Sequence, residues 1–167
     1  MIKSTKKLTW IKNEHAQTMV EFALVFPIVL LITYGIIEFG RMLFIYAAVT
    51  GSAREGARYG IAAGVGANGF VQYADCQGIR DAVRKTAFLI SIPDSNINIQ
   101  YDNGSTIKSS CPPSTNPKDS NRIKLGDRII VTVTARYEPM IGGFLGIGGY
   151  DITQKNYRTI LLNVIAQ

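Results

Sequence analysis

Histidine and cysteine are scarce in this sequence: its 167 residues include one histidine, His15, and two cysteines, Cys76 and Cys111. A structural zinc site needs four nitrogen or sulfur ligands, so these residues are too few to form one. The carboxylates are scattered, and no nucleophile stands in a motif with a base and a residue to orient it. We therefore expect no metal site, no cofactor and no enzymatic activity.

Charge is nearly absent from a long stretch near the N-terminus. Between residues 19 and 49 only Glu21, Glu38 and Arg41 are charged, and most of the others are apolar. This composition predicts a helix over residues 17–60, which at about 1.5 Å per residue would be roughly 66 Å long. A bilayer core is only about 30 Å thick. The first part of the helix is therefore expected to cross a membrane, and the second part to extend into water as a stalk.

Nucleic-acid binding has little support, although the formal net charge is +6. Part of the excess comes from Lys3, Lys6, Lys7 and Lys12, which precede the apolar run, and basic residues are not interleaved with aromatic ones elsewhere. A basic flank favours keeping its side of a span in the cytoplasm. We therefore expect no nucleic-acid partner. The chain is expected to have three parts: a cytoplasmic leader or tail (1–16), the hydrophobic helix (17–60) and a small extracytoplasmic domain (61–167).

Both cysteines would lie on the outer side of the membrane in this arrangement. An even number of cysteines in an oxidising compartment suggests a disulfide, here between Cys76 and Cys111. Closing a loop of this length stabilises a fold by about 4 kcal/mol on the chain-entropy model. Two free thiols remain the alternative, because the sequence does not show that the two residues are close.

Three interpretations of the apolar run compete. A secretory signal would be cleaved near Ala47 and Ala48, but the run is longer than such signals and contains charges. An uncleaved single-span anchor is the second interpretation. The third starts from Glu21, because a carboxylate inside an apolar segment is costly and suggests a function by default.

The residues around Glu21 resemble a type IV prepilin processing site. Residues 16–22 read AQTMVEF and follow a short lysine-rich leader. The resemblance implies cleavage between Ala16 and Gln17, which makes Glu21 the fifth residue of the mature chain; the residue before the cleaved bond is usually glycine, whereas here it is alanine. The later text VEFALVFPIVLL and AREGARYG narrows the resemblance to the TadE-like family, the minor pilins or pseudopilins of tight-adherence pilus systems.

This resemblance implies a structural subunit held in the cytoplasmic membrane by one span, with its N-terminus in the cytoplasm and its C-terminal domain outside, or later in an extracellular pilus. The implied partners are other pilin or pseudopilin subunits, a prepilin peptidase, the inner-membrane pilus assembly machinery and the lipid bilayer. Glu21 of one subunit would pair with the new amino group at Gln17 of its neighbour. The alternative is a single-span, membrane-anchored extracytoplasmic binding domain that enters no filament.

Two further features of the helix have open interpretations. Pro27 removes a backbone hydrogen bond, so it marks either a simple kink or a weak point that lets the helix stretch on insertion into a filament. Small residues recur every four positions on one face, which lets another backbone approach closely. That partner is either this chain's own domain or a neighbouring subunit's helix; the stripe consists of Ala48, Ser52, Gly56 and Gly60.

A second helix is predicted after a glycine-rich segment. Residues 61–73 contain a GxGxxG spelling, but a long helix precedes it instead of a strand, so we expect a flexible linker and no nucleotide-binding loop. Residues 75–90 have helical periodicity, and Arg80 falls largely outside their apolar face. Pro93 ends this helix.

The remaining residues predict an antiparallel sheet, so the fold class is α+β: a long N-terminal transmembrane helix followed by a small domain with one helix and that sheet. Residues 97–101 and 128–137 alternate as half-buried strands do, and residues 151–164 are the expected hairpin partner of the second strand. Residues 105–121 hold three prolines and predict a loop.

The connection between the two hairpin strands is unusually apolar. Residues 138–150 read EPMIGGFLGIGGY, and no lysine follows the glycines, so a phosphate-binding loop is excluded. The loop is either buried over the domain's own core or exposed as a contact surface for a membrane or another subunit. The residues that would make this contact are Ile141, Phe144 and Leu145.

Overall fold

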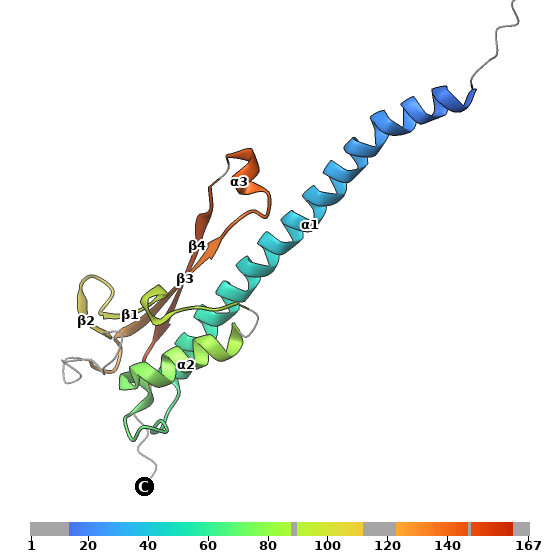
Figure 1. Cartoon of the computed structure of the whole chain (residues 1–167). Helices are drawn as coiled ribbons and strands as arrows, with labels where there is room; N and C mark the ends of the chain where they lie inside the picture. Colours follow the sequence, from blue (N-terminus) through green and yellow to red (C-terminus); the bar gives the residue numbers. More distant parts are fainter. Residues whose placement is uncertain (1–13, 88–89, 112–122, 147, 162–167) are drawn as a thin grey trace, which may run out of the picture. The chain divides into compact units, whose positions relative to one another are not determined.

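The computed structural model describes residues 14–87, 90–111, 123–146 and 148–161 (Figure 1). Its first element is a continuous helix, α1 (Glu14–Ile61), which confirms the predicted long apolar helix and includes Pro27. Within the described part of the chain, α1 is the one helix that is long and apolar enough to cross a membrane. The presence of this helix supports the interpretation of the chain as a single-pass membrane protein.

The chain forms two compact units, and the boundary between them lies inside α1. The first unit ends at Phe39, and the second runs from Gly40 to Gln167. We call the second unit the head. About six turns of α1, from Gly40 to Ile61, therefore belong to the head, where residues such as Val49 and Ala57 form part of its core.

A four-stranded antiparallel sheet forms one layer of the head, in the order β2-β1-β3-β4. The predicted hairpin is confirmed: β3 pairs with β4 along its whole length, from Arg128 opposite Thr159 to Tyr137 opposite Tyr150. The predicted last strand, 151–164, is too long, because β4 ends at Thr159 and residues 160 and 161 are not part of it; residues 162–164 lie outside the described residues. The strands are β1 (Ile97–Asp102), β2 (Ile107–Cys111), β3 (Arg128–Tyr137) and β4 (Tyr150–Thr159).

One predicted loop is wrong over part of its length. Within residues 105–121, the segment Ile107–Cys111 is the edge strand β2, which pairs with β1 and places Cys111 opposite Ile99. Its residues are mostly polar and partly exposed, because an edge strand has one neighbour and little burial. Residues 112–122 of the predicted loop lie outside the described residues.

The core lies between one face of the sheet and two helices. Alternate β3 residues, among them Val131 and Val133, are fully buried. They face Val49 and Ala57 of α1, together with residues of α2 (Cys76–Thr86) such as Val83. The opposite face of the sheet is largely polar, the usual pattern for an antiparallel sheet covered on one side. The C-terminal part of α1 thus contributes side chains to the core of the head.

The second helix is shorter than the predicted 75–90. Asp75 is its N-cap, and its carboxylate accepts a hydrogen bond of 2.9 Å from the amide of Gly78. The preceding segment is a hydrogen-bonded turn and not a flexible linker, since Val65 and Val71 form a β-bridge and a 3-10 turn follows at Gln72–Ala74. The turn follows α1 directly, so the GxGxxG spelling lacks the strand that a dinucleotide site requires.

Candidate membrane and assembly surfaces

The first unit displays apolar side chains around the helix. From residue 17 to residue 33 every side chain is exposed, including Met19, Phe22 and Leu31. A soluble protein rarely leaves so large an apolar surface uncovered. Lipid or other apolar helices are the surroundings that such a helix requires, because its backbone groups are already satisfied by the helix itself.

The sequence-predicted processing and assembly residues all lie in this first unit. Gln17 and Glu21 are exposed, one turn apart on α1, and Pro27 follows in the same helix. Ala16 is part of the helical backbone, and its side chain lies outside the described residues. The structure therefore places Gln17 and Glu21 where a neighbouring chain can reach them.

The stripe of small residues belongs to the head and faces its sheet and α2. Ser52, Gly56 and Gly60 are buried, and Ala48 is half-buried. A Cβ atom added to Gly56 would lie 2.5 Å from Val83 Cγ2 of α2 and 3.3 Å from Val131 Cγ1 of β3. Glycine at this position allows α1 to approach both elements closely, so in this structure the stripe is covered by elements of the chain's own head.

This close approach makes a matched pair of substitutions informative. Gly56→Ala should lower the free energy of unfolding by about 1–3 kcal/mol, because the new methyl group overlaps stiff, fully buried valines. Gly51→Ala should raise it by up to about 1 kcal/mol, because helix propensity improves and the nearest atom, Thr86 Cγ2, is 3.7 Å away. Urea unfolding of the full chain in detergent, followed by circular dichroism, measures both. Equal shifts for the two variants would contradict the packing described here.

A disulfide joins α2 to the edge strand β2, between Cys76 and Cys111, whose Cα atoms are 5.7 Å apart. Arg80 lies beside it and is 1% exposed, so its predicted position outside the apolar face is wrong. Its guanidinium donates hydrogen bonds to the carbonyl oxygens of Cys111 (3.0 Å) and Cys76 (3.4 Å). Burial lowers the pKa of Arg80, and the negative charge of Asp94 opposes this effect. The arginine and the disulfide together fix β2 to the helix.

Two ion pairs tie the strands together at the end of the sheet. Arg128 donates two hydrogen bonds of 2.8 Å to Asp102, and this contact lowers the pKa of that carboxyl. Burial alone would raise the pKa of Asp127, but the hydrogen bond from Lys108 and a backbone N–H bond from Lys124 lower it overall. Both carboxylates have partners within the fold, which assigns them a structural role.

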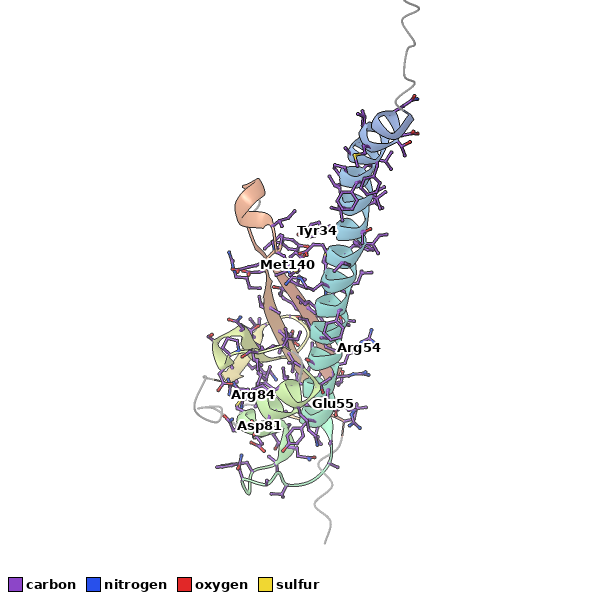
Figure 2. The ribbon with its side chains drawn as sticks, turned by 45° about the vertical axis from the view of Figure 1, so that its right-hand side comes forward. Tyr34, Arg54, Glu55, Asp81, Arg84 and Met140 are labelled. Carbon is purple, nitrogen blue, oxygen red and sulfur yellow. A yellow bond between two sulfur atoms is a disulfide. The ribbon has the colours of Figure 1, made fainter. Side chains whose placement is uncertain are left out.

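A groove of about 570 Å³ lies between the end of α1, the following turn and α2. Figure 2 labels Glu55 on α1 and Asp81 on α2, which both line it. At its inner side the carboxylate of Asp75 accepts hydrogen bonds from Tyr59 (2.9 Å) and Asn68 (3.1 Å) in addition to its helix cap. Asp75 is thus committed to holding the turn. Among the described residues, no group of three acidic, histidine or cysteine side chains could hold a metal ion.

The apolar connection between β3 and β4 contains a short helix, α3 (Gly142–Leu145). Ile141 precedes this helix and is exposed, as is Met140, which Figure 2 labels. Phe144 and Leu145 belong to α3, and their side chains lie outside the described residues. The described apolar side chains of this connection face solvent and are not buried over the head's core.

Comparison with known proteins supports the resemblance found in the sequence. Residues 16–58 match the model of the family described as TadE-like protein. The match covers α1 almost to its end and leaves the sheet and α2 outside. Searches of curated proteins and of solved structures find no significant match to the chain.

Proposed function

We propose that this protein is a membrane-anchored, pilin-like structural subunit, a TadE-like minor pilin or pseudopilin that serves the assembly of a tight-adherence type IV pilus. The observation that carries the proposal is the coincidence of two boundaries. The TadE-like match begins at residue 16, where α1 enters its exposed apolar part, and it ends at residue 58, within the last turn of the helix. The residues that match the family model are therefore those of the long apolar helix, which supports a role for this helix like that of a pilin's N-terminal helix.

The proposed sequence of events uses residues at the start of α1. The chain waits in the cytoplasmic membrane with its N-terminus in the cytoplasm and its head outside, and a prepilin peptidase cuts between Ala16 and Gln17. The new amino group at Gln17 then pairs with Glu21 of a neighbouring pilin or pseudopilin while the inner-membrane assembly machinery moves the subunit out of the bilayer. Glu21 is exposed on the helix, as this pairing requires.

The mature N-terminus distinguishes this proposal from its alternatives. Mass spectrometry of the protein purified from its own membranes should find a chain that starts at Gln17. An intact Met1 would instead favour a single-span, membrane-anchored extracytoplasmic binding domain, and a start near Val49 would indicate a secreted domain. An Ala16→Gly variant is the control: it restores the residue that prepilins usually have before the cleaved bond, so it should be processed at least as completely. Failure of both chains to lose the leader would contradict the proposal.

A further inference from the structure

The end of the β3–β4 hairpin that carries the connection lies beside the first residues of the head, as the contacts along β3 show. The added Cβ of Gly60 would meet Ile129 near the beginning of β3, and that of Gly56 would meet Val131. At the other end of β3, the Tyr137 ring lies against Arg41. Strand β3 therefore runs antiparallel to the part of α1 in the head, and the connection after Tyr137 lies beside the second residue of this unit.

Arg41 holds the base of this connection. Its guanidinium carbon is 5.0 Å from the centre of the Tyr137 ring, and one of its amino groups donates a hydrogen bond to the carbonyl oxygen of Glu138. Tyr137 is buried and packs on Tyr150 of β4, with ring centres 5.1 Å apart. Both strands of the hairpin are thus fixed to the helix at Arg41, just before the connection begins.

The connection itself is uncharged and apolar. We call residues 139–149 the tip; none of its eleven residues carries a charge. Met140 is 69% exposed and Ile141 is 39% exposed. The charges at the base of the tip are paired with one another, since Arg136 contacts Glu138 at 3.1 Å and Asp151 at 3.5 Å. The tip thus presents exposed apolar side chains above a base whose charges are neutralised.

The position of Arg41 in the sequence indicates what covers the tip. About 20 helical residues cross a bilayer core, and counted from Met19 they end near Gly40. Arginine at the end of a span is favourable at the level of the lipid headgroups, where its charge stays hydrated. A tip held at Arg41 lies at the same level.

We propose that the tip of the β3–β4 hairpin is a second membrane contact, which inserts Met140 and Ile141 into the interface of the bilayer and is held there by Arg41. The inference rests on the membrane anchoring in the proposed function and is independent of incorporation into a filament. It assigns the head a fixed orientation on the membrane before assembly. Because the tip is uncharged, its contact should depend little on anionic lipid or on salt.

Quenching of tryptophan fluorescence by brominated lipid tests the contact. The chain has one tryptophan, Trp10, so a Trp10→Phe background allows a single reporter to be placed elsewhere. Full-length Ile141→Trp and Met140→Trp chains are reconstituted in phosphatidylcholine vesicles with or without bromine on the acyl chains. The control is Ile107→Trp, an equally apolar position that is 61% exposed on the opposite edge strand, β2. Bromine should reduce the emission at the tip about twofold or more and leave the control unchanged.

Two results would overturn the contact. The first is tip emission that bromine reduces no more than the control in either variant, while circular dichroism and the disulfide are intact. The second is tip emission that bromine does not reduce but that becomes shielded from iodide as the protein-to-lipid ratio rises, which would mean that another copy of the chain covers the tip. The assay contains no other pilins, so its outcome does not depend on whether the chain enters a pilus.

The role of Arg41 is tested in the same vesicles. In an Arg41→Ala chain that carries Ile141→Trp, quenching by bromine should fall to near the level of the Ile107→Trp control, while carbonate extraction still leaves the chain in the membrane. Arg54→Ala removes an exposed arginine elsewhere on α1, labelled in Figure 2, and should leave the quenching unchanged. Full quenching in Arg41→Ala would show that Arg41 does not position the tip.

Discussion

A Glu21→Ala chain is expected to reach the membrane in normal amounts and to be nearly absent from assembled pili. Opposite charges about 4 Å apart attract by roughly 4 kcal/mol at an effective dielectric constant of about 20. Even half of that energy changes an association constant about thirtyfold. The pilus-bound fraction, measured by immunoblotting of sheared pili against membranes, should therefore fall by about tenfold or more. Membrane insertion should be undisturbed, because removing a carboxylate from an apolar helix makes insertion easier.

Two control variants separate the charge of Glu21 from its packing. Glu21→Gln keeps the shape of the side chain and loses its charge, so it should fail as Glu21→Ala does. Val20→Ala truncates the adjacent exposed side chain and should assemble normally. Normal incorporation of Glu21→Gln would rule out the pairing of Glu21 with an amino group, whatever the alanine variant does.

Removal of the disulfide should strongly lower the free energy of unfolding of the head. The bridge closes a loop of 35 residues in sequence separation. Such a closure stabilises a fold by about 4 kcal/mol on the chain-entropy model, and a whole domain is stable by only about 5–15 kcal/mol. The Cys76→Ala/Cys111→Ala chain in detergent should therefore unfold in urea with a free energy lower by about 4 kcal/mol.

Hydrogen exchange should show where this loss begins. Strand β2 has five residues and one neighbouring strand. Without the disulfide it is held by β1, by the hydrogen bond from Arg80 to Cys111 and by the ion pair of Lys108 with Asp127. The amides of Ile107–Cys111 should exchange faster than those of β3, which lies inside the sheet. Wild-type protein treated with a reductant is the control and should behave as the double variant does. A loss below about 1 kcal/mol with unchanged exchange would mean that the bridge adds nothing to the packing around it.

The elements that the sequence predicted well are those whose own composition decides them. Helix α1 follows from a run of apolar residues too long for a buried strand. In strand β3 every second residue from Ile129 to Tyr137 is buried, and its partner follows a connection short enough to require an antiparallel hairpin. Neither conclusion needed information from distant parts of the chain.

The features that the sequence did not predict depend on contacts between distant residues. An arginine in an amphipathic helix is assigned to water by its periodicity, but Arg80 is buried because the carbonyl oxygens of Cys76 and Cys111 accept its hydrogen bonds. Strand β2 has the composition of a loop, and its hydrogen bonds to β1 make it a strand. A stripe of small residues allows another element to pack closely, but the sequence does not show which element does so. The short distances around Gly56 identify it as the sheet and α2 of this chain's own head. Likewise, the contact between Arg41 and Tyr137 joins positions almost a hundred residues apart.

The burial of Val49, Ala53 and Ala57 in the core has a mechanical consequence. A pulling force that enters the head through α1 acts along β3, because the two run antiparallel, so many packed side chains resist sliding at the same time. A head joined only through a loop would instead be peeled from one end, contact by contact. If the chain is a pilus subunit, as we propose, traction on that pilus should therefore leave this head folded.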